Sequence, residues 1–259
     1  MSREKRPAGM RETAIIIGFR AKMGLARLLL ATMVAIAGAL LALSAQADPY
    51  SRKIVVLDPG HGGLDTGTRG SGGLFEKEVT LALARQVAAC LEPRYGAMLT
   101  RSGDYRLDGT DRVAMANAAR ADLFISFHAG GGFSPVAGGI NVFYGGLPAG
   151  DALTGTVTEK TADAGVARAW DAMNGKHLYA GRNLAALLRT RLAPLSLDGD
   201  AGMRQAPLAL LAGADMPAVL VEIGPITHPA VESRFQDSLY LSALAETVCA
   251  AVDQFFGYQ

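Results

Sequence analysis

The most informative stretch of the chain reads Lys53-Ile54-Val55-Val56-Leu57-Asp58-Pro59-Gly60-His61, an apolar β-branched run that leads into a glycine-containing turn and a histidine. Two later stretches have the same form: Asp122 to His128 ends in a histidine, and Ala218 to Glu222 ends in a glutamate. Runs this apolar are typical of strands that are covered on both faces, as in parallel sheets. Because parallel strands end at one edge, where open α/β sheets build their sites, His61, His128 and Glu222 are expected to converge.

The chain from Arg52 onward alternates short apolar runs with helical periodicity. This pattern predicts a single-domain α/β fold with an open, mostly parallel twisted sheet of about six strands and helices on both faces. Strands are expected at 53–57, 97–100, 123–127, 140–144, 208–211 and 218–221, and helices at 76–91, 111–119, 180–192 and 238–256. Residues 145–179 interrupt this rhythm with weak periodicity, and a connection that long is usually a functional loop or lid.

The N-terminal leader, residues 1–47, is expected to be a secretory signal peptide. Seven basic residues precede the almost wholly apolar stretch Leu28 to Leu43, and Ala45-Gln46-Ala47 supplies a cleavage site. Translation from Met23 would give a shorter leader of the same kind, and an uncleaved membrane anchor is the alternative. The catalytic domain is then 48–259, exported and located in the periplasm or at the cell wall, with no membrane association after cleavage.

Charge and cysteine content narrow the class of protein further. The whole chain has a net charge of +1, but residues 48–259 alone hold 18 basic and 22 acidic residues, a formal charge of −4. Without a basic stripe, a nucleic-acid partner is excluded, and a monomer is expected. Cys90 and Cys249 would reach an oxidising compartment, where a disulfide is permitted, yet both lie on apolar helical faces and also fit plain buried thiols.

Glu76 is a candidate metal ligand because of the helix face on which it lies. It shares the apolar stripe of the predicted helix with Val79, Leu83, Val87 and Cys90, whereas Glu78 falls on the polar side. A first-turn acid favoured by the helix dipole would explain the position of Glu76 but not its inward direction. With His61 and His128 it makes three ligands that leave a fourth position open, as a catalytic zinc site requires.

Glu222 is the candidate catalytic residue. It terminates the buried run Ala218-Val219-Leu220-Val221, where an acid is out of place unless it has a function. A carboxylate near zinc that does not bind the ion can take a proton from water and later hand it to a leaving amine. The alternative is an acid simply exposed at a strand end.

Five motifs in order carry a resemblance to a known family: Ile54 to Gly63 (IVVLDPGHGG), Leu74 to Glu78 (LFEKE), Leu99-Thr100-Arg101, Ser126 to Ala129 (SFHA) and Met216 to Gly224 (MPAVLVEIG). Together they resemble the zinc-dependent N-acetylmuramoyl-L-alanine amidases of the cell-wall hydrolase type, over essentially Arg52 to Phe256. The resemblance implies one zinc ion on His61, Glu76 and His128, with Glu222 catalytic. It also implies that the substrate is peptidoglycan, cleaved at the amide between the muramic acid lactyl group and the first L-alanine of the stem peptide.

The chain departs from the family pattern at Gly130, where relatives often have Asn, and at Pro225, where an aromatic residue is usual. These changes bear on substrate contacts rather than on the ligands. Arg101 and Arg112 also match family positions, and structural ion pairing is their expected role.

Some relatives carry an inhibitory helix at the place of residues 145–179, which plugs the zinc site with an acidic side chain. Glu159, Asp163 and His177 are the candidates for that role here, and an activator protein acting on the insertion would then be a partner. Another zinc hydrolase of cell-wall peptides, such as a carboxypeptidase or deacetylase, would use the same ligands. A non-catalytic wall-binding protein would be expected to lose the ligands or the glutamate, and all four residues are present.

Overall fold

The computed structural model describes residues 32–34, 52–130, 139–146 and 163–257, with side chains from residue 176 onward in the last range. The chain divides into two units, residues 1–51 and 52–259. All but three residues of the first unit lie outside the described ranges, so the signal peptide stays a prediction. The second unit contains the strands and the site.

The second unit is built on one six-stranded sheet in the order β2-β1-β3-β6-β4-β5. The strands are β1 (Ile54–Pro59), β2 (Gly96–Leu99), β3 (Leu123–His128), β4 (Ile140–Tyr144), β5 (Ala201–Gln205) and β6 (Ala218–Glu222). Strand β1 is parallel to β2 and β3, and β3 is parallel to β6, whereas β4 is antiparallel to β6 and parallel to β5. The carboxyl ends of β1, β3 and β6 therefore share one edge, and β4 and β5 end at the other.

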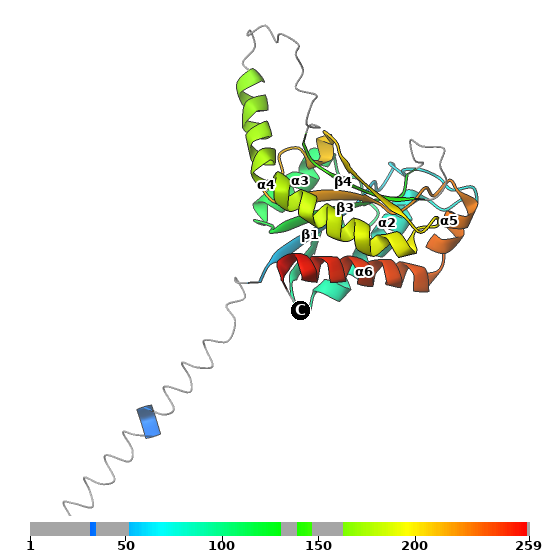
Figure 1. Cartoon of the computed structure of the whole chain (residues 1–259), viewed down its shortest axis with the longest axis horizontal. Coiled ribbons are helices and arrows are strands. Elements are labelled where there is room, and N and C mark those ends of the chain that lie inside the picture. The colour runs from blue at the N-terminus through cyan, green and yellow to red at the C-terminus, as the bar shows by residue number, and fades with distance from the viewer. Residues whose placement is uncertain (1–31, 35–51, 131–138, 147–162, 258–259) are drawn as a thin grey trace, which may run out of the picture. The chain divides into compact units, whose positions relative to one another are not determined.

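Helices cover both faces of this sheet (Figure 1). They are α2 (Glu76–Leu91), α3 (Gly109–Ala118), α4 (Asp163–Leu192), α5 (Pro229–Phe235) and α6 (Ser238–Phe256). Helices α2, α4 and α6 bury Leu83, Leu184 and Leu244 against alternate strand residues, and the opposite face holds a smaller cluster of Val56 and Phe124 with α3 and its neighbours. The alternation of Val55 and Val56 between the two clusters is the period of a strand buried on both sides. The predicted α/β sheet is confirmed.

Helix α6 is the central helix of the larger layer and packs against both α2 and α4. By length and mean hydropathy (19 residues, 1.2) it is the one described helix that could cross a membrane. Its burial against the sheet and its caps, Asp237 at the amino end and Gly257 at the carboxyl end, make it a core helix instead. The structure also joins Cys90 of α2 to Cys249 of α6, with Cα atoms 6.5 Å apart, which favours the disulfide over two free thiols.

Two predictions about secondary structure are wrong, and one helix was not predicted. The expected strand at 208–211 is a short 3-10 turn, Ala209–Leu211, and the missing strand is β5. The expected helix at 180–192 begins at Asp163, so the second half of the predicted loop 145–179 is helical. Helix α5 is an addition to the predicted elements. Four apolar residues in a row do not distinguish a strand from a turn, and good helix formers such as Ala continue α4 without an apolar stripe.

Candidate metal centre

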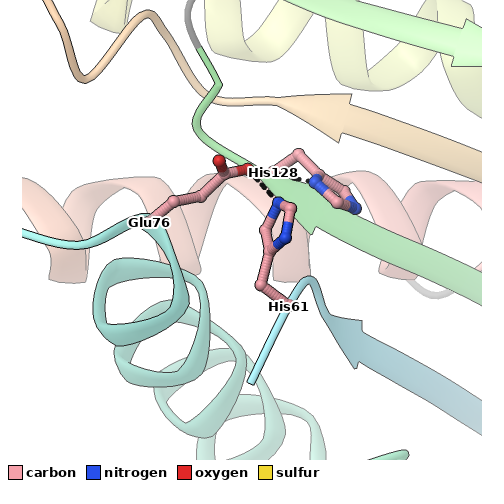
Figure 2. A group of neighbouring side chains, drawn as sticks. All are labelled: His61, Glu76 and His128. Atoms are coloured by element: carbon pink, nitrogen blue, oxygen red, sulfur yellow. Dashed lines mark hydrogen bonds and ion pairs between the residues drawn. The ribbon is translucent and has the colours of Figure 1, made fainter. Parts of the chain in front are cut away.

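His61, Glu76 and His128 meet at the carboxyl edge of the sheet (Figure 2). The Oε1 atom of Glu76 lies 3.1 Å from Nε2 of His61 and 3.0 Å from Nδ1 of His128. The potential ligand atoms of the three residues all lie within 4.8 Å of one another. Residues from a strand end, a loop and a helix start are thus brought to a single point.

Local structure positions the two imidazoles. His61 follows β1 with φ of 61°, in the left-handed region that non-glycine residues rarely adopt. The turn after it is closed by hydrogen bonds between the backbones of Gly62 and Asp65. His128 is the last residue of β3, and its ring lies against Gly60, where any Cβ would overlap it. Glycine at position 60 is therefore required by the second imidazole.

Glu76 is the first residue of α2 and is 1% exposed, whereas Glu78 is exposed and accepts a hydrogen bond from the backbone N–H of Phe75. The predicted burial of Glu76 and exposure of Glu78 are confirmed. Both Glu76 oxygens are also held by the backbone: Ala129 N donates to Oε1 at 2.9 Å and Thr68 N donates to Oε2 at 2.9 Å. The carboxylate is fixed before any ion arrives.

Glu222 ends β6 and lies opposite His128 in the register of the neighbouring strand. Its Oε2 accepts a hydrogen bond from Gly130 N at 3.0 Å. It is not among the three residues whose ligand atoms cluster. The structure therefore brings Glu222 to the same edge as the cluster but leaves it outside the ligand set.

Comparison with known proteins agrees with this geometry. Residues 55–254 match the family model described as N-acetylmuramoyl-L-alanine amidase. The chain belongs to the N-acetylmuramoyl-L-alanine amidase family. It is 32% identical over 221 residues to N-acetylmuramoyl-L-alanine amidase AmiA of Escherichia coli, covering 79% of this chain and 76% of that one. It is also 32% identical over 219 residues to N-acetylmuramoyl-L-alanine amidase AmiC of Neisseria meningitidis, covering 79% and 53%.

Solved structures show the same relationship. The amidase AmiC2 of Nostoc punctiforme superposes with a TM-score of 0.62 at 29% identity, covering 79% of this chain and 97% of that chain. The catalytic domain of the amidase CwlV of Bacillus (Paenibacillus) polymyxa superposes with a TM-score of 0.63 at 25% identity, covering 80% and 99%. The predictions of the fold, of a hydrolase and of a peptidoglycan amidase are confirmed.

The charges of the amidase site are interdependent. Burial alone would raise the pKa of Glu76, but hydrogen bonds from His128, His61 and two backbone N–H groups outweigh it and hold the pKa far below the ordinary value. Burial likewise would lower the pKa of His61, and the carboxylates of Glu76 and Asp65 outweigh it and raise the pKa. A fixed negative charge thus faces two imidazoles, an arrangement that suits a bound cation.

Asp65 was not predicted as a site residue. Its Oδ1 lies 2.9 Å from Nδ1 of His61 and accepts a second hydrogen bond from Gly67 N at 3.1 Å. A carboxylate at Nδ1 accepts the hydrogen bond from that nitrogen and fixes the orientation of the ring, so that Nε2 is the nitrogen available to a metal ion, as with outer partners of metal-binding histidines. Its sequence signal is weak because one aspartate in a glycine-rich turn is ordinary.

Two buried arginines hold the backbone before and at His61. Arg112 Nη1 pairs with Asp58 at 2.7 Å and also donates to the carbonyl of Pro59, while Nη2 and Nε donate to the carbonyls of His61 and Leu107. Arg101 is fully buried and donates to the carbonyls of Pro59, Gly60, Lys77 and Gly103. The ion pairing expected of both arginines is found for Arg112. For Arg101 the described residues provide hydrogen bonds to carbonyl groups and no ion pair.

Of the three candidates for inhibition, His177 is the one whose side chain is described, and it lies away from the centre. His177 on α4 lies 3.3 Å from Asp215, which precedes β6, at the edge opposite to Glu222. Glu159 lies outside the described residues, and of Asp163 only its place at the start of α4 is described. Control of the site by Glu159 or Asp163, and release by an activator, stay predictions.

Proposed function

We propose that the chain binds one zinc ion through His61, Glu76 and His128, and that Glu222 is the general base and acid of amide hydrolysis. The observation that carries this proposal is the meeting of two imidazole nitrogens at one carboxylate oxygen, 3.1 and 3.0 Å away. The substrate is the amide between N-acetylmuramic acid and the L-alanine of the stem peptide, as in the family.

The donor set fits a catalytic zinc ion. Two nitrogens and one oxygen are borderline ligands of the kind that zinc prefers, and zinc bonds of about 2.0–2.2 Å in tetrahedral geometry separate ligand atoms by roughly 3.3 Å. The contacts of 3.0 and 3.1 Å at Oε1 need only a small expansion to reach that separation. Three protein ligands leave the fourth position for water or substrate, whereas a structural site would be closed.

The chemistry divides between the ion and Glu222. When bound, zinc supplies Lewis acidity, which lowers the pKa of a water molecule toward about 7 and polarises the substrate carbonyl. Glu222 takes a proton from the attacking water and gives it to the departing amine. Burial raises the pKa of Glu222 above the ordinary value, which suits a group that must first accept a proton and then donate it near neutral pH. Gly130 N holds Oε2, so Oε1 is the oxygen left to face water.

The proposed place of action is outside the cytoplasmic membrane. The apolar stretch Leu28 to Leu43 and the Ala45-Gln46-Ala47 site support export of residues 48–259, and a peptidoglycan substrate requires it. The disulfide between Cys90 and Cys249 is consistent with an oxidising compartment.

The test is digestion of purified sacculi by residues 48–259, with zinc or with a chelator, followed by mass analysis of the products. We expect stem peptides with a free L-alanine amine, in the zinc sample alone. Glu222→Gln should retain the ion and lose activity by about 10²–10⁴-fold, the usual contribution of a general acid or base. Glu246→Gln, at an exposed position of α6, is the matched control and should remain active.

Other products would identify the competing hydrolases. Release of a terminal D-amino acid would indicate a carboxypeptidase, and release of acetate would indicate a deacetylase. Activity that survives removal of all bound transition metal, or full activity of Glu222→Gln, would contradict the proposal.

A further inference from the structure

Glu232 is a buried carboxylate that the proposed mechanism does not use. It lies on α5 and is 3% exposed, and no cation of the described residues lies within ion-pair distance of it. Its oxygens accept hydrogen bonds from Gly72 N (2.6 Å), Leu74 N (3.0 Å) and Ser71 Oγ (3.0 Å). All three donors belong to one turn, about 160 residues away in sequence.

The turn is shaped to accept that carboxylate. Residues 70–74 close on themselves through hydrogen bonds from Gly70 N to the carbonyl of Leu74 and from Gly73 N to the carbonyl of Gly70. A Cβ built at Gly70 would overlap the Glu232 carboxylate, and one at Gly72 would lie 3.1 Å from it. The backbone N–H groups of Gly72 and Leu74 hold the pKa of Glu232 below its ordinary value. The charge is thus stabilised by oriented backbone dipoles, as in anion-binding turns.

The base of the same turn is closed by the ligand Glu76. Glu76 N donates to the carbonyl of Thr68 at 2.9 Å, and Thr68 N donates to Oε2 of Glu76 at 2.9 Å. The tip of the turn is therefore bound by Glu232, and its base is bound by the carboxylate whose other oxygen faces the two histidines. A shift of the turn would move the N–H group that orients Glu76.

The segment that carries Glu232 is itself tied to the rest of the site. It continues from Glu222 through hydrogen bonds of Ile223 N to the carbonyl of His128 (2.8 Å) and of Ile226 N to the carbonyl of Ala129 (3.3 Å). Glu232 N then bonds to the carbonyl of His228 at 3.0 Å. Glu232 consequently links the segment after the catalytic glutamate and the second histidine to the turn that orients Glu76.

We propose that Glu232 is a positioning residue: it locks the 70–74 turn onto α5 so that Glu76 stays aimed at His61 and His128 and zinc binds to a preformed site. This rests on the proposed zinc function. A purely structural bond would contribute to folding without any effect on the affinity for the ion. If Glu232 instead positions the site through the turn, loss of its hydrogen bonds to the turn should weaken metal binding in a protein that is still folded.

The test compares Glu232→Gln, Glu232→Ala and the control Glu246→Gln in the mature chain. Glutamine keeps the volume but replaces one of the two acceptor oxygens with an NH₂ group, so that the N–H group of either Gly72 or Leu74 faces a donor. We expect zinc affinity, measured by competition with a chromogenic chelator, to fall about 10-fold, at the low end for outer partners of metal ligands. Hydrogen exchange at Gly72, Leu74 and Thr68 should accelerate, while exchange in the central strands β1 and β3 stays slow. The control should match the wild type in both.

Unchanged zinc affinity in Glu232→Gln, together with faster exchange at Gly72 and Leu74, would overturn the proposal and leave a structural bond. If the Glu232 variants do not fold, Ser71→Ala removes one donor from the same carboxylate and should lower zinc affinity by a smaller factor; no change there would also overturn it. A wild-type chain that binds no zinc would instead refute the proposed function, so the two failures are distinguishable.

Discussion

A histidine–carboxylate pair lies at each of the two opposite edges of the sheet, and the surroundings of the two pairs differ. His61 and Glu76 are 3.1 Å apart, and His177 and Asp215 are 3.3 Å apart. The two histidine side chains are almost equally exposed, at 23% and 21%. The carboxylates differ: the Glu76 side chain is 2% exposed and the Asp215 side chain is 50% exposed.

The partners of each carboxylate differ as well. Glu76 is bound by a second imidazole and two backbone N–H groups, whereas the Oδ1 atom of Asp215 that faces His177 is shared with the exposed Lys176, 3.2 Å away. Each edge thus pairs a histidine with a carboxylate at a similar distance, and the two carboxylates differ in their burial and in their other partners. A buried carboxylate with fixed donors is preorganised for a cation, and an exposed one is screened by water.

The largest expected difference between the two edges is in zinc affinity after removal of a histidine. Zinc sites bind with about 10–16 kcal/mol in total, so removal of one of three protein ligands in His128→Ala is expected to cost about 4 kcal/mol, roughly a thousandfold in affinity. His177→Ala should bind zinc as the wild type does. Competition with a chelator measures both. Equal loss in the two variants would show that the ion binds elsewhere or at both edges.

The next largest effect is expected on folding stability, when the buried ion pair between Arg112 and Asp58 is broken. Arg112→Ala leaves the fully buried carboxylate of Asp58 without its cation, and breaking such a pair lowers the free energy of unfolding by about 3–5 kcal/mol. Because Thr100 and Ser126 still donate hydrogen bonds to Asp58, we expect a loss at the lower end, about 3 kcal/mol. Lys53→Ala breaks the surface pair with Asp122 (2.7 Å) and should cost about 0–1 kcal/mol. Urea denaturation of both variants is the measurement. If Arg112→Ala cost as little stability as Lys53→Ala, the buried pair would not stabilise the backbone beneath the site.

Burial also explains which parts of the fold and of the site can be predicted from the sequence. Continuous apolar runs and an inward-facing acid were sufficient to predict β1, β3, β6 and the place of Glu76, because burial leaves a pattern in the chain. Strand β5, Ala-Gly-Met-Arg-Gln, lies at the edge of the sheet and carries no such run. The contacts of Asp65 and Glu232 were not predictable, since each depends on how a glycine turn closes and on what another segment presents to it.

Asp65 offers a finer test within the site. Asp65→Ala removes the acceptor at Nδ1 of His61 and should weaken zinc binding by about 10–100-fold, the usual cost of losing an outer partner. Asp65→Asn keeps an acceptor oxygen and should recover part of that loss. Asp104→Ala is the matched control, because Asp104 accepts hydrogen bonds from Gly63 N of the same turn and from Lys77 of α2 and is not among the hydrogen-bond partners of the His61 imidazole in the described part of the chain. Equal affinities for Asp65→Ala and wild type would mean that the turn alone orients His61.

The smallest effects should have opposite signs at the two edges when zinc is removed. Burial raises the pKa of Glu222, so its contribution to stability is complete below the ordinary value of about 4.5 and is lost as pH rises through the folded-state pKa. Glu222→Gln cannot ionise and should gain thermal stability relative to wild type as the pH rises above the ordinary value of about 4.5.

Lys176 and then His177 lower the pKa of Asp215, so its contribution is present above the ordinary value and is lost in acid. Asp215→Asn should therefore be slightly less stable than the wild type above the ordinary value of about 3.8, and this difference should disappear in more acidic solution; the effect is small because the pair is exposed. Melting temperatures of the three proteins in chelator test this. If the melting temperatures of the two variants, relative to wild type, changed with pH in the same direction, burial of the carboxylate would not determine the sign of the effect. The two edges would then differ only in the partners of their carboxylates.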